Sequence, residues 1–314
     1  MYTEEKDSLL KHTNTNLKRE EFTTKNSNPN SQTLPSNELT NEFENLLEQN
    51  LVWIFGAGRS GTTWLAKELL SYNTHVIDEP YLGNHLQTPG GVKKIHEFHK
   101  KRNDYFFSDA YKKIWFYYLR KLILNRFYSQ IQDYSKHVII KEPHGTMGSG
   151  NIIECLPKCK IIVVLRDGRD VLDSEIAANS PGGWSTKDTG ISISSKIDFI
   201  KRYANQWNKL IETLFNTYES HPKELKYLVR YEDLRKNTVE ELEKIYTFLK
   251  IDISNDQIVK IVNKFSFENI PSAKKGLGKS RRSATPGKWK ENFNEKEKEL
   301  MNSIMGKTLE KIGY

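Results

Sequence analysis

The chain contains few cysteines and no long apolar run, and both absences narrow what it can be. Only two cysteines, Cys155 and Cys159, occur among the 314 residues. Without a second pair or a nearby histidine they form neither a disulfide framework nor a metal cluster, so we expect reduced, structural thiols. No apolar stretch reaches the ~18 residues of a membrane span, and the N-terminus lacks a signal-peptide run. The sequence therefore predicts no membrane span and a cytoplasmic location.

Composition separates the start of the chain from the remainder. The first fifty residues hold five Lys/Arg and nine Asp/Glu, are rich in Asn, Thr and Ser, and show no hydrophobic periodicity before about Asn41. Such a segment buries too little apolar surface to offset its ordering entropy. We expect a disordered polar tail over residues 1–40 and one domain over residues 41–314. Past residue 50 the balance is 43 basic against 31 acidic residues, which favours anionic ligands.

Short β-branched runs alternate with longer helical stretches, which predicts an α/β fold with an open parallel sheet flanked by helices. The strands are apolar almost throughout, so burial on both faces is expected. The predicted strands are 51–55, 75–78, 137–141, 160–165 and 225–230. The predicted helices are 41–51, 62–72, 111–127, 169–178, 196–218, 238–249, 255–264 and 295–312.

One helical segment allows two interpretations. Residues 114–128 mix aromatic and aliphatic side chains with Arg and Lys. This composition suits a helix lying on a membrane surface. The ordinary pattern of amphipathic helices favours a helix that packs on the core.

The most informative segment is a strand that enters a glycine turn and then a helix, over residues 53–65. Backbone N–H groups at such a turn, together with the helix N-terminus, cradle a phosphate, which is the P-loop architecture. The spacing Gly-x4-Gly occurs as Gly56 to Gly61, but Thr62 replaces the lysine of nucleoside triphosphatases. The positive charge lies at Arg59 instead. This loop suits a donor whose 5′-phosphate carries a group other than the further phosphates of a nucleoside triphosphate. Its candidate ligand-binding residues are Gly58, Arg59, Ser60, Gly61, Thr62, Thr63 and Trp64.

Two further basic clusters follow. Arg166 leaves the fourth predicted strand at the same sheet edge as Arg59, and Ser174 lies eight residues later, about two helical turns on. An arginine and a hydroxyl there make a second anion site. The third cluster is a basic loop, residues 279–293, that ends in an aromatic residue. Taken alone, the Arg166 cluster is better explained by surface ion pairs. The basic loop, taken alone, could be a patch for nucleic acid or for an acidic membrane.

Together these segments resemble the sulfotransferases that use 3′-phosphoadenosine 5′-phosphosulfate (PAPS). The family's 5′-phosphosulfate loop matches residues 58–64, and its 3′-phosphate motif matches Arg166 with Ser174. Its late motif matches residues 282–293, although Ser283 and Ala284 replace Lys and Gly. The resemblance implies an enzyme that moves a sulfuryl group to a hydroxyl or amine of a sugar, lipid or phenol, releasing 3′,5′-ADP without a metal. It also implies nucleotide contacts from Tyr231, Arg281, Arg282, Gly287 and Lys288, and no nucleic-acid partner.

The resemblance also suggests catalytic residues. Arg59 and Lys141 are expected to stabilise negative charge at the transferred group. Three residues compete for the general base: Glu79, His144 and Glu142. Position favours Glu79, twenty residues past Arg59, provided that burial raises its pKa. Pro80 predicts an extended backbone at Glu79.

Two other function classes remain possible from sequence. One is a P-loop kinase acting on a small molecule, against which the missing loop lysine counts. The other is a non-catalytic nucleotide- or nucleic-acid-binding module that uses the same basic surface. The acceptor, a small molecule or glycan, is expected to contact residues 80–135 and 179–195, which match no interpretable motif.

Overall fold

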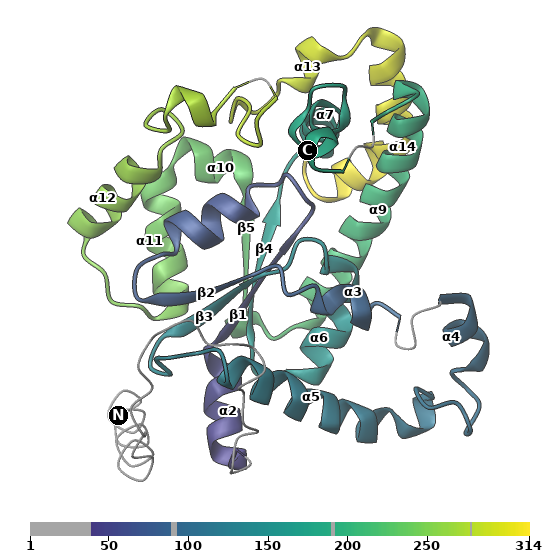
Figure 1. Cartoon of the computed structure of the whole chain (residues 1–314), viewed down its shortest axis with the longest axis vertical. Helices are drawn as coiled ribbons and strands as arrows, with labels where there is room; N and C mark the ends of the chain where they lie inside the picture. Colours follow the sequence, from purple (N-terminus) through teal and green to yellow (C-terminus); the bar gives the residue numbers. More distant parts are fainter. Residues whose placement is uncertain (1–38, 89–92, 190–191, 277) are drawn as a thin grey trace.

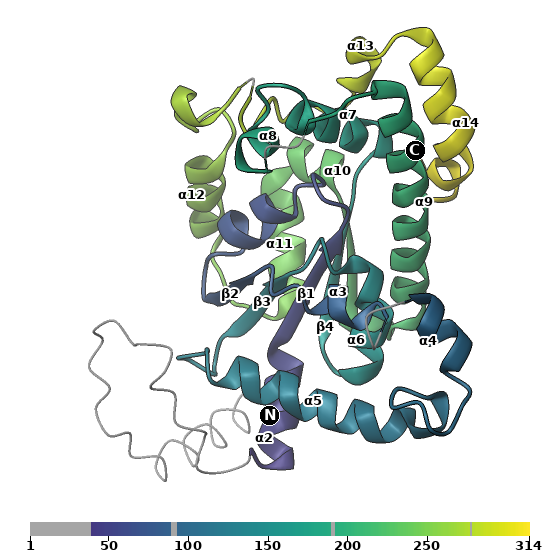
Figure 2. The same cartoon turned by 45° about the vertical axis from the view of Figure 1, so that its right-hand side comes forward.

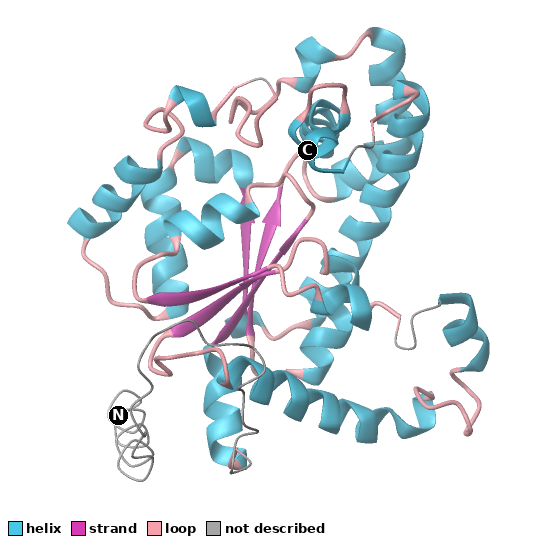
Figure 3. Cartoon of the chain, in the orientation of Figure 1, coloured by secondary structure: helices cyan, strands magenta, loops and turns pink. Residues whose placement is uncertain are grey.

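Five parallel strands form one open sheet between two layers of helices, as the alternating pattern predicts (Figure 1, Figure 3). The computed structural model describes residues 39–88, 93–189, 192–276 and 278–314. The tail predicted over residues 1–40 therefore lies outside the described residues, except for Leu39 and Thr40.

The five predicted strands are confirmed to within a residue at each end. The strand order is β2-β3-β1-β4-β5, with β1 at the centre. Because all neighbours are parallel, the loops that follow β1, β3 and β4 meet at one edge of the sheet, where ligands bind in open α/β folds. The strands are β1 (Leu51–Gly56), β2 (Thr74–Asp78), β3 (His137–Lys141), β4 (Lys160–Leu165) and β5 (Lys226–Arg230).

The predicted helices are present, and the first of the crossover helices is unusual. The segment after β1 forms a π-helix, η2 (Trp64–Leu69), a rare geometry that is frequent at functional sites. Other predicted helices are α2 (Asn41–Asn50), α5 (Lys112–Tyr128), α7 (Gly168–Asn179), α9 (Lys196–Ser220), α11 (Thr238–Leu249), α12 (Asn255–Phe265) and α14 (Glu295–Lys311). Short elements that the periodicity did not predict are α3 (Leu82–Leu86), α4 (Lys93–His99), η3 (Asp109–Tyr111), η4 (Thr146–Gly148), α6 (Ser149–Cys155), α8 (Trp184–Thr189), η5 (Lys223–Leu225), α10 (Tyr231–Lys236), η6 (Ser272–Lys274) and α13 (Trp289–Asn292).

The core has two halves because side chains alternate across the sheet. On β1, Trp53 and Phe55 join the layer that contains α5, α6, α9 and α14, whereas Val52 and Ile54 join the layer of η2, α11 and α12 (Figure 2). Burial on both faces holds for the three central strands. It is wrong for the edge strands β2 and β5, whose residues are mostly half-buried because each has only one neighbouring strand.

Helix α5 packs on the core with one face, as the amphipathic pattern favours. Phe116, Ile123 and Phe127 are buried on it. Its Arg120 forms ion pairs with the buried carboxylates of Glu44 at 2.6 Å and Glu48 at 2.7 Å, which attach α2 to α5. Across the described residues, every helix falls short of the length or apolarity needed to cross a bilayer.

Both cysteines are free and buried, which confirms the expectation of structural thiols. Burial raises the pKa of Cys155 to about 12 and that of Cys159 well above its usual value. Because the thiolate is the reactive form, neither side chain is a nucleophile at neutral pH.

Candidate functional site

Gly56, at which β1 ends and the turn begins, is held in place by its neighbours. Gly56 lies so close to β4 that a Cβ atom there would be 2.7 Å from the Val164 carbonyl oxygen. The buried Thr146 hydroxyl accepts a hydrogen bond from the Gly56 N–H at 3.1 Å and donates to its carbonyl at 2.8 Å. The N–H groups of residues 61–63 lie at the start of the helix, where N–H groups have no intrahelical carbonyl partner and can bind an anion.

Gly61 allows an aromatic ring to pack beneath the turn. Its φ is +89°, and a Cβ atom there would lie 2.6 Å from the ring of Tyr231. The Arg166 guanidinium lies over the same ring at 4.4 Å from the centroid, and Trp64 meets the ring edge-to-face at 6.5 Å. The turn, the end of β4 and the start of α10 therefore converge at this point.

Arg59 reaches from the turn toward the second predicted anion site. Its backbone is left-handed, with φ of 65°. Its Nε donates to Ser174 Oγ at 3.1 Å, and its Nη2 donates to the Ser280 carbonyl at 2.5 Å. Burial lowers the pKa of Arg59 below its usual value, opposed by the nearby carboxylate of Glu175. Arg59 thus contacts all three segments that the sequence singled out.

Arg166, which directly follows β4, contacts the turn. Its Nη1 donates to the Arg59 carbonyl at 2.7 Å. Its Nε is buried and has no hydrogen-bond partner among the described residues. A buried guanidinium N–H without an acceptor is costly, so this position of Arg166 lowers stability.

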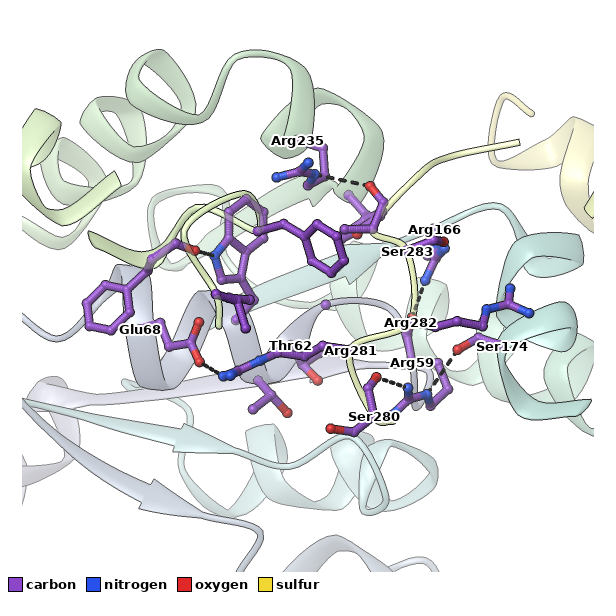
Figure 4. A pocket seen from close by; sticks show the side chains of 18 residues that line it. Arg59, Thr62, Glu68, Arg166, Ser174, Arg235, Ser280, Arg281, Arg282 and Ser283 are labelled. Carbon is purple, nitrogen blue, oxygen red and sulfur yellow. Dashed lines mark hydrogen bonds and ion pairs between the residues drawn. The ribbon is translucent and has the colours of Figure 1, made fainter. Parts of the chain in front are cut away.

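These residues line one pocket, shown in Figure 4. One part of its wall is basic and polar, formed by Arg59, Arg166, Ser174 and the late loop. Another part is apolar, with Trp64, Phe265, Phe267 and Ile270. Predicted binding residues that line the pocket are Arg59, Gly61, Thr62, Thr63, Trp64, Arg166, Ser174, Tyr231, Arg281 and Arg282. Those absent from its wall are Gly58, Ser60, Gly287 and Lys288.

The paired arginines of the late loop are held by carboxylates. Arg281 forms an ion pair with Glu68 of η2, and Arg282 forms one with Asp173 of α7. Each guanidinium has five N–H donors, so each can hold a carboxylate and still bind a phosphate.

Helix α7 also fixes the second half of the late loop. The buried Asp170 carboxylate accepts hydrogen bonds from the N–H of Gly287 at 2.6 Å and of Trp289 at 3.2 Å. Gly287 adopts φ of +82°, which favours glycine. Lys288 points away and pairs with Glu291 at 3.0 Å. Gly287 therefore shapes the loop, and Lys288 lies on the surface.

Lys141, at the end of β3, lies beside the turn. Its buried ammonium donates to Thr63 Oγ1 at 3.0 Å and to Glu79 Oε1 at 2.6 Å. It is also 2.9 Å from Asp78 Oδ1. The predicted neighbourhood of Lys141, Glu79 and the turn is present in the structure.

Glu79 differs from two expectations. Its φ is +50°, so the extended backbone predicted from Pro80 is wrong. The hydrogen bond that its N–H donates to the Lys141 carbonyl at 2.9 Å holds the chain there against the local preference. Burial raises the pKa of Glu79, but the hydrogen bond and charge of Lys141 outweigh it and leave a lowered pKa. The elevated pKa required of a carboxylate base is therefore absent.

His144 lies close to Glu79 and to the turn. Its Nε2 is 3.8 Å from Glu79 Oε1, and its ring stacks on Tyr81 at 5.7 Å between centroids. Its Cε1 is 4.0 Å from the position of a Cβ atom on Gly58. The side chain is 53% exposed, so an acceptor can reach it.

Glu142, the third candidate base, is buried behind this group. Neither carboxylate oxygen has a hydrogen-bond partner among the described residues. Burial raises its pKa to about 7, although backbone N–H groups of residues 81–83 lie near enough to oppose the shift. A Cβ atom on Gly145 would lie 2.1 Å from Glu142 Oε1, so the carboxylate is closely covered.

Several pocket residues were not predicted. Arg235 donates to the Ala284 carbonyl at 3.2 Å and lies over the Trp64 ring at 5.5 Å. Phe265, the last residue of α12, and Phe267, two residues later, form part of the apolar wall. The Phe-Ser-Phe spacing was the only sequence pattern that could have indicated this wall. It does not predict a pocket, because the two rings reach the site only through tertiary contacts. In the part of the chain that the structure describes, no three His, Cys, Asp or Glu residues form a candidate metal site.

The sequence and the fold are similar to those of known proteins. The family model for the sulfotransferase domain matches residues 49–313. Mouse sulfotransferase 1B1 is 26% identical over 178 residues, which are 48% of this chain and 54% of that protein. The chain thus spans about half the length of this curated relative.

Solved structures share the fold. A crystal structure of mouse sulfotransferase SULT7A1 complexed with PAP has a TM-score of 0.52 and 16% identity, over 85% of this chain and 90% of that one. A crystal structure of retinol dehydratase in complex with retinol and PAP gives a TM-score of 0.52 and 16% identity, over 83% and 81% of the two chains. These likenesses confirm the predicted P-loop-type α/β fold.

Proposed function

Because the chain belongs to the sulfotransferase family, we propose that it transfers a sulfuryl group from PAPS to a hydroxyl or amine of a small-molecule or glycan acceptor. The observation that carries this proposal is the pocket in which the turn after β1, Arg166 with Ser174, and the late loop all meet. PAPS carries anionic groups at two separate positions and an adenine base. The basic part of the pocket wall suits the anionic groups, and the apolar part suits the adenine.

Different pocket residues bind different parts of the donor. The N–H groups of residues 61–63 hold the 5′-phosphosulfate at the helix N-terminus. Arg166 and Ser174 hold the 3′-phosphate together with Arg282. The apolar wall at Trp64, Phe265 and Phe267 accepts the adenine.

Positive groups beside the turn assist the transfer. Bound PAPS supplies the sulfuryl group and a phosphate leaving group. Lys141, held at Thr63, is positioned to stabilise charge that develops on the oxygen between sulfur and phosphorus. Arg59 adds charge from the turn itself. No metal ligand set is required of these residues.

We propose His144 as the general base. Glu79 is engaged by Lys141 and has a lowered pKa, so it is a weak proton acceptor. Glu142 is covered by Gly145 and cannot reach an acceptor. His144 is accessible, and Glu79 lies 3.8 Å from its Nε2, where a carboxylate favours the imidazolium that forms. Glu79 then acts as a positioning residue.

Transfer of radiolabelled sulfate from PAPS to a panel of phenols, sugars, lipids and amines tests the function. Sulfation of any acceptor, with release of 3′,5′-ADP, supports it. ATP-dependent phosphorylation would instead favour a P-loop kinase, and salt-sensitive DNA binding without transfer would favour a nucleic-acid-binding module.

We also propose that residues 41–314 form one catalytic domain in the cytoplasm. The family match begins at residue 49, and the two thiols are reduced and buried. Limited proteolysis that leaves an active fragment starting near residue 41 supports this division, and loss of activity with the first forty residues contradicts it.

A further inference from the structure

One lobe of the molecule extends away from the sheet, in both views of the chain (Figure 1, Figure 2). It consists of α4, the following loop and α5, residues 93–128, and we refer to it as the α4–α5 lobe. It carries none of the residues that line the pocket or that were proposed for catalysis.

The α4–α5 lobe gathers most of the exposed apolar side chains. Ten large hydrophobic residues are exposed in the described chain, and seven of them lie between residues 98 and 122. Exposure reaches 78% at Phe98 and 66% at Leu122. The seven are Phe98, Phe106, Tyr111, Ile114, Tyr117, Tyr118 and Leu122. Single exposed apolar residues are normal, but such a concentration marks an interaction surface.

Four of these residues form a stripe along one face of α5, beginning at Tyr111, the residue that precedes the helix. Tyr111, Ile114, Tyr118 and Leu122 are spaced three, four and four apart, the helical repeat of a single face. The opposite face buries the core residues described above. Helix α5 is therefore apolar on two sides, and only one of them has a partner within the described chain.

The charge around the stripe is positive. Helix α5 contains five Lys or Arg residues and no Asp or Glu. Three of the five are paired with carboxylates of neighbouring helices: Lys112 with Glu154, and Arg120 and Lys121 with α2. Arg126, four residues after Leu122, is exposed beside the stripe. Lys113 is exposed in the first turn of α5, and Lys101 is exposed in the preceding loop.

We propose that the α4–α5 lobe is a docking surface for an anionic lipid bilayer. A projecting ridge of Tyr, Phe, Ile and Leu with Lys and Arg at its edges suits the headgroup layer, where aromatic rings and long basic side chains lie with their polar ends in water. Anionic headgroups complement the basic edge. The lobe projects from the rest of the molecule (Figure 1, Figure 2), whereas a partner peptide is usually held in a groove.

Such docking does not cover the pocket proposed to bind PAPS. Helix α5 packs on α2, which precedes β1, so it lies toward the amino ends of the strands. The pocket lies at the carboxyl ends. A bilayer on the α4–α5 lobe therefore leaves the pocket open, and no helix needs to span the membrane.

Cosedimentation of the full chain with vesicles tests the proposal without measuring activity. We expect the protein to bind phosphatidylcholine vesicles that contain phosphatidylserine, to bind pure phosphatidylcholine more weakly, and to dissociate at high salt. The double variant Ile114→Glu, Leu122→Glu should bind at least about tenfold more weakly with an unchanged melting temperature.

A matched control uses exposed apolar residues elsewhere. Ile197 and Val259 are 40% and 37% exposed, and Ile197→Glu, Val259→Glu adds the same charge outside the lobe. This control should bind vesicles as the wild type does. Absent binding to phosphatidylserine vesicles, or equal loss in both double variants, overturns the proposal. So does a wild-type dimer that the lobe variant converts to a monomer, because a second copy would then cover the stripe.

Discussion

Lys141 Nζ lies 2.6 Å from Glu79 Oε1 and so joins the end of β3 to the residue that follows β2. The lysine side chain is 4% exposed and the glutamate side chain 25% exposed. In this setting, the ion pair places the lysine beside the turn and lowers the pKa of the Glu79 carboxylate, which makes it a weak proton acceptor. Removing either partner leaves the other without its compensating charge.

We predict that His144→Gln lowers kcat by about 10²- to 10⁴-fold, the usual contribution of a general base. The substitution should leave the affinity for 3′,5′-ADP unchanged, because His144 is not among the pocket residues. Glu79→Gln should cause a smaller loss. Steady-state kinetics with the best acceptor and calorimetry with 3′,5′-ADP measure both effects.

The pH profile distinguishes the two residues. A base must be unprotonated, so kcat/KM falls as the pH drops below its pKa. A histidine places that fall between about pH 5 and 8, whereas a carboxylate with a lowered pKa places it below about 4.3. This fall of kcat/KM at low pH should disappear in His144→Gln and persist in Glu79→Gln. The reverse pattern would restore Glu79 as the base.

Arg59 is predicted to act mainly on the chemical step. Arg59→Ala should lower kcat by about a hundredfold or more, the loss expected from one donor at developing charge. Arg59→Lys should recover only part of it, since a lysine cannot bond Ser174 and Ser280 with two fixed nitrogens. An unchanged kcat with a raised KM would mean that Arg59 only binds the donor.

Asp170 is predicted to position the late loop. It accepts two backbone N–H bonds on separate oxygens, and Asp170→Asn retains only one acceptor. Calorimetry should show weaker binding of 3′,5′-ADP and little change for 5′-AMP, because Arg282 belongs to this loop. Asp104→Asn, on the exposed surface, is a control. Equal losses for both nucleotides would indicate general disruption instead.

Glu142 gives a pH-dependent stability with a defined sign. Its pKa is raised to about 7 by burial, so between its ordinary value and pH 7 the folded protein binds more protons than the unfolded chain. The free energy of unfolding then falls as pH rises through that range. Glu142→Gln removes the effect, so its melting temperature relative to wild type should rise between pH 5 and 8. A constant difference across this range would contradict the assignment.

Much of the fold could be predicted because it depends on local patterns. Continuous apolar runs identified the strands, and the turn with Gly56 and Gly61 identified the site's starting point. The exposure of the edge strands could not be predicted, because it depends on strand order, and composition alone does not reveal which strands have a single neighbour.

The predictions about the site were wrong or incomplete where tertiary contacts outweigh the local conformational preference of the chain. The left-handed backbone at Glu79 depends on a hydrogen bond to β3, although Pro80 favours an extended chain. Ser174 faces Arg59 as well as the second anion site, so two clusters that are separate in sequence share one pocket. The apolar wall at Phe265 likewise exists only after α12 packs on η2.

Calorimetric titration of 3′,5′-ADP and 5′-AMP into the wild type, Arg166→Ala and Arg202→Ala tests the central claim most directly. Arg202 is an exposed arginine on α9 and serves as the control. The wild type should bind 3′,5′-ADP far more tightly than 5′-AMP. Arg166→Ala should weaken only 3′,5′-ADP, by about 1.5 to 3 kcal/mol, the loss of a hydrogen bond to a charged group. Equal affinity of the wild type for the two nucleotides would contradict a PAPS site.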